Sequence, residues 1–401
     1  MKLTIADDAG EETITVEAED RALEPVLNYL GELADGEGPV RPDPQTDNDG
    51  SRAAGAPAAA TADTSATGRR LVEGEDYHDL GGIRVTVDPE ANQVGRPTGE
   101  TVHGLSVLEA SNPPVPDVQT PYYPARMSDS RDSEEVIARA LGRMDKPVLL
   151  EGEAGTGKNT AILTLADRTN RPVTRMNFGA DTTVFDLVGE KDIVGGDTVY
   201  ILGELARAAV FGWIFVADEV NMAEGDVTSH LHAICEESGR RRLNLRGTGR
   251  TLTDLPADVE WDAEAHLGHY IHPEFQFVGT ANPLTYAGTS DMNDAFRSRF
   301  VALPVEYLPP DAEASLLVAE TGVDEAIAER LTRVAEQLRE AHRRDELETP
   351  ISHRELLKTV EMAGPDEEFM PVAEAARLVM VGHADLKLDK ATIRDTITAE
   401  L

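Results

Sequence analysis

Residues 148–160 read Val148-Leu149-Leu150-Glu151-Gly152-Glu153-Ala154-Gly155-Thr156-Gly157-Lys158-Asn159-Thr160, an apolar strand followed by a glycine-rich loop that ends in Gly-Lys. Glycines let consecutive N–H groups of such a loop face phosphate oxygens, and the lysine neutralises the β and γ phosphates. A helix that begins near Lys158 adds the positive end of its dipole. The segment therefore predicts a nucleotide site, with residues 152–160 as the phosphate loop and ATP as the ligand.

The loop departs from the common pattern G-x-x-x-x-G-K-[ST] at its last position. Asn159 stands there in place of the hydroxyl residue that normally contacts magnesium. An asparagine carbonyl oxygen can ligate a hard cation directly or through water, so we expect Asn159 to contribute to Mg²⁺ binding. The same departure leaves open a protein that binds the nucleotide but turns it over slowly.

Composition restricts the class of partner. The 401 residues include 74 Asp and Glu against 37 Lys and Arg, which gives a formal net charge of −37, and only seven of the basic residues are lysine. An acidic, lysine-poor surface is typical of a protein that stays soluble in concentrated salt, where charge repulsion is strongly screened. We therefore expect a halophilic archaeal or viral origin. The charge also argues against a nucleic-acid partner, which requires a basic face.

Cysteine content and apolar runs bear on the compartment. The single cysteine, Cys235, excludes an internal disulfide and a cysteine-rich zinc site. No run reaches the roughly 20 consecutive apolar residues of a membrane-spanning helix, and the first eight residues lack the pattern of a signal peptide. The expectation is a cytoplasmic protein that does not contact a membrane.

Patterning divides the chain into five segments. Alternating runs at Lys2–Ile5 and Thr13–Glu17, followed by a helical run over 21–33, predict a small N-terminal α+β module. A stretch rich in Pro, Ala, Asp, Thr and Gly is typical of a disordered linker. Near the C-terminus apolar residues recur at helical spacing, as across Asp324–Arg344. The segments are a module (1–35), a linker (36–70), an irregular pre-core region (71–130), a core (131–308) and a helical lid (309–401).

The core is predicted to be an α/β fold. Short apolar runs separated by helical stretches indicate a mainly parallel sheet with helices on both faces. These runs are Val148–Glu151, Val173–Asn177, Ile214–Ala217 and Phe275–Thr280. In such sheets ligands bind at the carboxyl ends of the strands, so polar residues at those ends are candidates for the site.

Polar side chains end two of these strands. One strand delivers Asp218 and Glu219, of which Asp218 is expected to hold Mg²⁺ and Glu219 to act as the general base that polarises the attacking water. The strand over 275–280 is followed by Asn282, which we expect between the carboxylates and the γ-phosphate. Locally, an asparagine before a proline also fits a turn residue. The order of phosphate loop, acidic strand and amide-ended strand favours the site.

Together these motifs resemble the core of the AAA+ ATPases, and within that superfamily the MoxR group, especially its CbbQ/NorQ/CobS-like members. The resemblance covers about residues 133–400 and implies an α/β P-loop core followed by a helical lid. It assigns Walker A to 152–160, Walker B to 214–219 and sensor 1 to Asn282. It also relates Phe185–Gly189 and the following glycines to the family's helix-2 insert, a hairpin near the ring pore, and residues 235–250 to a second hairpin.

Three arginines gain roles through the resemblance. The segment Asp294–Phe300 resembles the arginine-finger motif, with Arg299 as the first candidate and Arg297 as the second. Such a finger lends positive charge to the γ-phosphate of the neighbouring subunit, which implies a homo-oligomeric ring, expected to be a hexamer. Arg354 opens a lid helix and resembles sensor 2, which contacts the phosphate in its own subunit. An ordinary surface ion pair is the alternative for each arginine.

Three histidines lie outside the motifs. His266, His269 and His272 are spaced by three residues, in a segment that is longer and more acidic than a hairpin requires. Such spacing raises a metal site as an alternative, although no cysteine lies nearby and a solvated loop is the more common outcome.

The function implied by the resemblance is a Mg-ATP-dependent ring ATPase of the MoxR type that remodels, activates or assembles a partner protein complex. In the family, such ATPases commonly act with a partner that carries a von Willebrand factor A domain. Two alternatives stay open: the ATPase subunit of a CobS-like metal-chelatase complex, and a nucleotide-switch scaffold with little turnover. Nothing in the sequence identifies the client protein.

Overall fold

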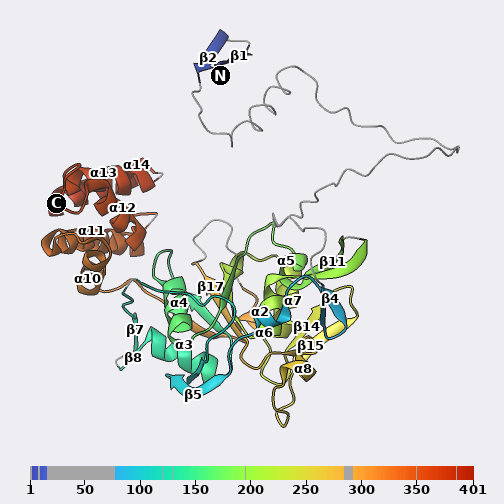
Figure 1. The fold of residues 1–401 in the computed structure, drawn as a ribbon. Helices are drawn as coiled ribbons and strands as arrows, with labels where there is room; N and C mark the ends of the chain where they lie inside the picture. Colours follow the sequence, from blue (N-terminus) through green and yellow to red (C-terminus); the bar gives the residue numbers. More distant parts are fainter. Residues whose placement is uncertain are drawn as a thin grey trace. The chain divides into compact units, whose positions relative to one another are not determined.

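The computed structural model of the chain describes residues 2–7, 10–15 and 77–401, except 120, 129, 195, 284–291, 349 and 385 (Figure 1). The chain divides into two units, Met1–Thr61 and Ala62–Leu401. In the first unit, β1 (Lys2–Asp7) and β2 (Gly10–Thr15) form an antiparallel hairpin, so both strands predicted there exist, with shifted ends. The helix predicted over 21–33 and the linker predicted over 36–70 lie outside the described residues.

A five-stranded sheet forms the centre of the second unit. Its order is β10-β13-β17-β9-β18, and every neighbouring pair is parallel, which confirms the predicted α/β class. Four strands coincide with the predicted apolar runs to within one residue, whereas β18 directly follows the arginine motif and was not among them. The strands are β9 (Val148–Glu151), β10 (Val173–Asn177), β13 (Ile214–Asp218), β17 (Gln276–Ala281) and β18 (Val301–Pro304).

Helices cover both faces of this sheet because alternate side chains of each strand point to opposite sides. Val148 and Leu150 of β9 pack in one cluster with α3 and α4, whereas Leu149 packs in the other with α5, α6 and α7. The two groups of helices lie on opposite sides of the sheet in Figure 1. Their bounds are α3 (Ser133–Gly142), α4 (Lys158–Arg168), α5 (Val184–Val188), α6 (Glu204–Phe211) and α7 (Gly225–Ile234).

The pre-core region is more regular than its sequence indicates. Strands β3 (His78–Leu80) and β4 (Ile83–Val85) extend the hairpin of β11 (Gly189–Val194) and β12 (Asp197–Leu202) into a four-stranded sheet. The run Ile83–Val87 predicts a strand at β4, whereas the three residues of β3 carry too little alternation to be predicted. The other elements before the core are α2 (Pro89–Asn92), β5 (Pro97–Val102), β6 (Leu105–Leu108), β7 (Arg126–Ser128) and β8 (Arg131–Asp132).

Smaller elements connect the later core strands. A 3-10 turn, η1, follows β13, and α9 carries the arginine motif towards β18. The bounds are η1 (Val220–Met222), β14 (Arg242–Leu245), β15 (Arg250–Asp254), α8 (Ala263–His266), β16 (Tyr270–Ile271) and α9 (Asp294–Arg297).

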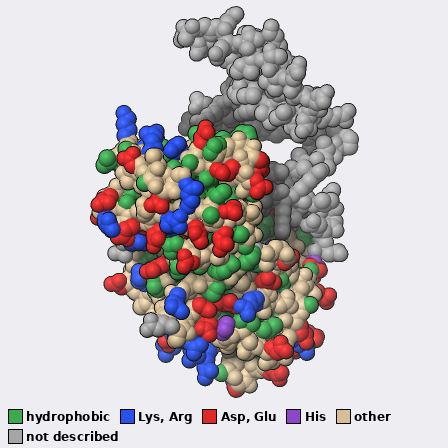
Figure 2. Space-filling model, turned by 90° about the vertical axis from the view of Figure 1, so that its left-hand side faces the viewer, with side chains coloured by type: hydrophobic (Ala, Val, Ile, Leu, Met, Phe, Trp, Pro, Cys, Tyr) green, Lys and Arg blue, Asp and Glu red, His purple; other side chains and the backbone are tan. Residues whose placement is uncertain are grey.

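Five helices form the predicted lid, with a hydrophobic cluster of their own. They are α10 (Pro310–Thr321), α11 (Glu325–Arg343), α12 (His353–Ala363), α13 (Val372–His383) and α14 (Lys387–Glu400). Figure 2 shows Asp and Glu side chains spread widely over the described surface on the face viewed, as the net charge leads one to expect. Within the described residues, no helix combines the length and apolar character needed to cross a membrane.

Candidate active site

The phosphate loop connects β9 to α4, with Lys158 as the first helical residue. Gly157 precedes the helix and has a φ of 84°, a backbone conformation that residues with a side chain rarely adopt. Gly155 has a φ of 76°, and a Cβ at this position would lie 2.6 Å from the Cβ of Ser352. The loop therefore needs glycine both for its turn and for its contact with the start of lid helix α12.

Lys158 joins this loop to the end of β17. Its Nζ donates hydrogen bonds to the carbonyl oxygens of Gly152 at 2.6 Å and Glu153 at 2.8 Å, and to Oδ1 of Asn282 at 3.1 Å. Burial lowers the pKa of Lys158 to about 8, although the charge of Asp218 acts in the opposite direction. The ammonium group is thus held beside the sensor-1 candidate.

The two predicted carboxylates lie at the end of β13, as the sequence predicted. Glu219 has φ 56° and ψ 42°, a left-handed conformation that costs a non-glycine residue about 1–3 kcal/mol and is typical of functional sites. The N–H of Glu219 donates to Oγ1 of Thr280 at 3.0 Å, and the Thr280 hydroxyl donates to Oδ1 of Asp218. Asn282 donates through Nδ2 to Oε1 of Glu219 at 2.8 Å. Asp218, Glu219 and Asn282 therefore meet at one edge of the sheet.

Thr280 is a site residue that the sequence reasoning missed. Its side chain is fully buried in β17, yet it holds the strained backbone of Glu219 and the carboxylate of Asp218 together. The sequence signal is a hydroxyl residue near the end of a largely apolar strand, two positions before Asn282.

Asn159 fits the metal-binding role expected of it. Its Nδ2 donates to Oδ2 of Asp218 at 3.0 Å, whereas its Oδ1 is buried and accepts no hydrogen bond within the described residues. A buried oxygen without a donor is costly unless something else satisfies it. Beside a carboxylate, this neutral oxygen belongs to the donor set that Mg²⁺ prefers.

A cavity of about 350 Å³ encloses these groups. Lid residue Arg354, the sensor-2 candidate, lines the cavity together with loop residues 154–160. The wall that the sequence did not predict comes from the pre-core segment Val118–Ala125, whose Tyr122 hydrogen-bonds to Ser133 at 2.8 Å. Burial raises the pKa of Tyr122 to about 12, so it stays an uncharged phenol. A tyrosine pair in a proline-rich run is the signal that was available.

A buried ion-pair network links the lid to the phosphate loop. The hydroxyl of Tyr307 donates to the carbonyl of Ala154 at 3.0 Å, and the Arg339 guanidinium lies 3.9 Å from the Tyr307 ring centroid. Arg339 binds both carboxylate oxygens of Glu313, at 2.7 and 2.8 Å. Glu313 in turn contacts Nδ1 of His353 at 3.2 Å. His353, the residue next to Arg354, is therefore connected to the loop through three side chains, those of Glu313, Arg339 and Tyr307.

This network gives the lid a pH-dependent stability. Burial lowers the pKa of His353, but its hydrogen bonds to Glu313 and Glu320 outweigh burial and raise it above 6.5. The stability gained from the charged ring is therefore complete below pH ~6.5 and is lost as the pH rises through the folded-state pKa. Arg339 faces the same Glu313.

We expect His353→Gln to lower the melting temperature more at pH 6 than at pH 9, because only the charged imidazole pairs with the two carboxylates. Thermal denaturation at both pH values tests this, with His230→Gln as the control. Equal losses at the two pH values would contradict the role assigned to the ion pairs of His353.

Neither finger candidate lines the cavity of its own chain. Arg297 contacts Oε2 of Glu151 at 2.6 Å, with about half of its side chain exposed. Arg299 contacts Oε1 of Glu236 through Nε at 3.0 Å and is a quarter exposed. Arg297 is the last residue of α9, and Arg299 lies two residues beyond it.

The histidine-rich segment forms no metal site. Among the described residues, no group of three or more His, Cys, Asp or Glu side chains is placed to hold a metal ion. His272 is buried and accepts from the N–H of Glu274 at 3.1 Å, whereas His269 contacts Arg250 at 3.2 Å. The metal alternative for these histidines is therefore wrong.

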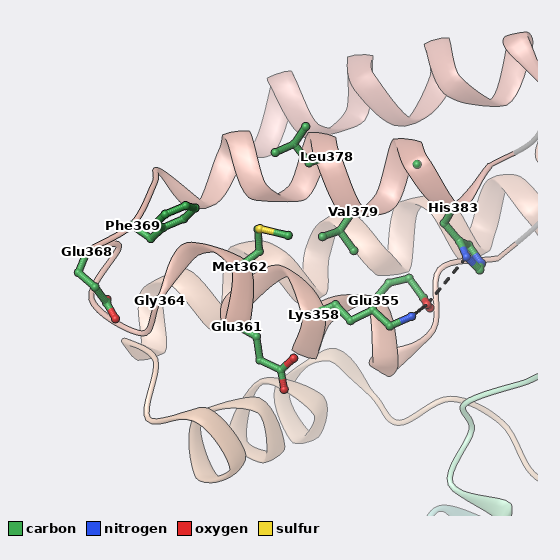
Figure 3. A pocket seen from close by; sticks show the side chains of 11 residues that line it. Glu355, Lys358, Glu361, Met362, Gly364, Glu368, Phe369, Leu378, Val379 and His383 are labelled. Carbon is green, nitrogen blue, oxygen red and sulfur yellow. Dashed lines mark hydrogen bonds and ion pairs between the residues drawn. The ribbon is translucent and has the colours of Figure 1, made fainter. Parts of the chain in front are cut away.

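A second cavity, of about 750 Å³, lies within the lid between α12 and α13 (Figure 3). Met362, Phe369 and Leu378 line it, and Glu355 links Lys358 and His383 at its edge. It contains no part of the phosphate loop and neither of the strand-end carboxylates. Chemistry rather than volume therefore identifies the site on the core.

Comparison with known proteins agrees with this arrangement. The family described as "AAA domain (dynein-related subfamily)" matches residues 147–300, and the family described as "CbbQ/NirQ/NorQ C-terminal" matches residues 313–399. The denitrification regulatory protein NirQ of Pseudomonas aeruginosa is 32% identical over 275 residues, which cover 68% of this chain and 94% of that protein.

Two further relatives have the same pattern. Protein NorQ of Paracoccus denitrificans is 30% identical over 55% of this chain and 74% of its own length. Protein CbbQ of Hydrogenophilus thermoluteolus is 30% identical over 54% of this chain and 72% of its own. The two family matches span both the core and the lid, and with these relatives they establish that the chain belongs to the CbbQ/NirQ/NorQ family of AAA+ ATPases.

Proposed function

We propose that this chain hydrolyses Mg-ATP in a homo-oligomeric ring, expected to be a hexamer, and uses the energy to remodel or activate a partner protein complex. The observation that supports hydrolysis most strongly is the position of Asn282. Its Oδ1 accepts from Lys158 and its Nδ2 donates to Glu219, so one amide connects the phosphate-binding lysine to the carboxylate proposed as general base. A group that only bound phosphate would not require this second contact.

The residues divide the chemistry between them. The N–H groups of the loop and Lys158 hold the phosphates, while Glu219 takes a proton from the attacking water. Asn282 orients that carboxylate, and Thr280 fixes the backbone that carries it. Because these groups are placed before substrate arrives, little reorganisation is needed at the reaction step.

Asp218 and Asn159 are the residues that would hold Mg²⁺, since a hydrogen bond joins their side chains and Oδ1 of Asn159 is buried without a donor among the described residues. When bound, the ion neutralises charge on the phosphate oxygens.

We expect Asn159→Ala to raise the Mg²⁺ concentration for half-maximal turnover by about 10-fold or more, since a contact near a metal is usually worth that much. Asn159→Thr restores the common hydroxyl and is expected to keep the requirement low. Titration of Mg²⁺ at saturating ATP measures both. An unchanged requirement in Asn159→Ala would contradict the metal contact.

Arginine completes the site in this proposal. Arg354 contacts the phosphate from the lid of the same subunit, since it lines the cavity. Arg299, with Arg297 as the second candidate, reaches the γ-phosphate of the neighbouring subunit. The absence of both from the cavity lining of their own chain is compatible with action in trans.

The proposed partner is a cytoplasmic client or partner protein that carries a von Willebrand factor A domain. One relative is named a denitrification regulatory protein, which supports a regulatory rather than a metabolic role. Among the described residues, the chain has no second group of residues arranged for catalysis. ATP hydrolysis would therefore be its reaction, and the energy released would be used to remodel the partner.

Steady-state phosphate release tests the proposal. The purified protein is assayed in molar salt, the condition that suits the expected halophilic origin, with Mg-ATP over a range of protein concentrations. Turnover per subunit is expected to rise with concentration, because active sites shared between subunits form only in the assembly. ATP that binds but is not hydrolysed at any concentration would instead support the nucleotide switch. That second candidate is motivated by Asn159, which stands where the common loop pattern has a hydroxyl residue.

A further inference from the structure

The guanidinium of Arg299 is held in one orientation by its own chain. Nε and one terminal nitrogen donate to the same oxygen, Oε1 of Glu236, and the other terminal nitrogen donates to the carbonyl of Ala295. A guanidinium carries five N–H donors in a rigid fork. These contacts use three of them and leave one N–H on each terminal nitrogen, a pair that suits two oxygens of a phosphate.

The segment that carries Arg299 is also held in place. The Phe296 side chain of α9 is buried and stacks on His232 of α7, with centroids 4.8 Å apart and planes 7° from parallel. Its other neighbour is Phe300, at 5.0 Å, which contacts Phe277 of β17 at 5.9 Å. The backbone at Arg299 is therefore anchored to the central sheet and to α7.

Helix α7 connects the hydrolysis site to the contacts of Arg299. Helix α7 follows the turn after Glu219, and Glu236 lies just beyond its last residue, Ile234. His232 and Glu236, four residues apart, contact Phe296 and Arg299 respectively. The helix therefore links the hydrolysis site of a subunit to the arginine that the same subunit presents.

We propose that Glu236 is a positioning residue for the arginine finger: it holds the Arg299 side chain so that its two remaining N–H groups face outward to the γ-phosphate of the neighbouring subunit. This inference rests on the proposed function. Without Glu236, a long side chain would sample many rotamers, and a misplacement of the order of 1 Å lowers a rate by about 100-fold.

A neighbouring ion pair provides a matched control. Glu237, the next residue, contacts Nζ of Lys146 at 2.9 Å, and its side chain is more exposed than that of Glu236, 64% against 34%. The two glutamates carry the same charge, are adjacent in the sequence and each form an ion pair. Only Glu236, however, contacts Arg299. A general effect of removing an acidic side chain from this surface would therefore appear in both variants.

Steady-state kinetics of the full-length ring test the proposal. Glu236→Ala is expected to lower kcat by about 10- to 100-fold while KM for ATP stays within about twofold, because the nucleotide is bound by the other residues of the site. Glu236→Gln keeps an oxygen acceptor and is expected to fall between Glu236→Ala and wild type, and it carries the test if Glu236→Ala does not fold. Glu237→Ala is expected to match wild type.

A double variant shows whether Glu236 acts through Arg299. In an Arg299→Ala background, adding Glu236→Ala is expected to have no further effect on kcat, since the group it orients is gone. A further loss would overturn the proposal, as would normal kcat in Glu236→Ala when Arg299→Ala is impaired. Normal kcat in Arg299→Ala itself would instead contradict the finger assignment on which the inference rests.

Discussion

Replacing Arg299 with alanine is expected to leave ATP binding intact and to lower turnover by about 1,000-fold or more, the loss typical of a missing arginine finger. Arg299 does not line the cavity of its own chain, so the Kd for ATP should change little. Its contact with the γ-phosphate of a neighbour would matter only as charge develops during transfer. Equilibrium binding of a labelled nucleotide and steady-state phosphate release measure the two effects separately.

Arg297→Ala is the matched control for this prediction. Arg297 lies two residues away, is more exposed and pairs with Glu151 instead of Glu236. A modest effect is expected, since an exposed ion pair contributes about 0–1 kcal/mol. If Arg299→Ala keeps normal turnover and Arg297→Ala loses it, Arg297 is the finger. If both keep it, neither arginine acts in trans.

The second large effect is expected from Glu219→Gln. The amide keeps the size of the carboxylate but cannot accept the proton of the attacking water, so turnover should fall by about 100- to 10,000-fold. ATP should still bind, because Lys158 and the loop amides are unchanged. The variant is therefore expected to retain nucleotide in a binding assay while phosphate release is nearly lost.

Glu224→Gln serves as the control for Glu219→Gln. Glu224 is an exposed carboxylate at the start of α7, only five residues along the chain. It should hydrolyse ATP at the wild-type rate. Near-normal turnover in Glu219→Gln would identify another group as the base and contradict the role that the contact with Asn282 supports.

Much of the nucleotide site could be predicted because it lies at the ends of buried strands. Parallel strands bring their carboxyl ends to one edge, so a loop after β9 and polar residues after β13 and β17 have to meet there. For this reason, one network of hydrogen bonds connects four residues of the site: Lys158, Asp218, Glu219 and Asn282. Local patterning was sufficient for these strands and for lid helix α11.

The remainder depends on contacts between segments far apart in sequence. Tyr122 reaches the cavity from a proline-rich segment without regular structure. In the sequence, little distinguishes Thr280 from the other residues of a buried strand, although its hydroxyl binds the backbone of the site. Glu236 pairs with an arginine 63 residues later, which no local pattern indicates. The short strand β3 pairs with β4, which in turn pairs with β12 of the β11–β12 hairpin.

The claim that each active site is shared between two subunits is tested most directly by mixing two inactive variants. Arg299→Ala keeps its base but lacks the finger, and Glu219→Gln keeps the finger but lacks the base. In rings assembled at random from equal amounts, half of the subunits keep the base and the other half keep the finger. An interface therefore combines an intact base with an intact finger in about one quarter of cases. We expect phosphate release at about one quarter of the wild-type rate, whereas activity no greater than that of the separate variants would contradict a shared site.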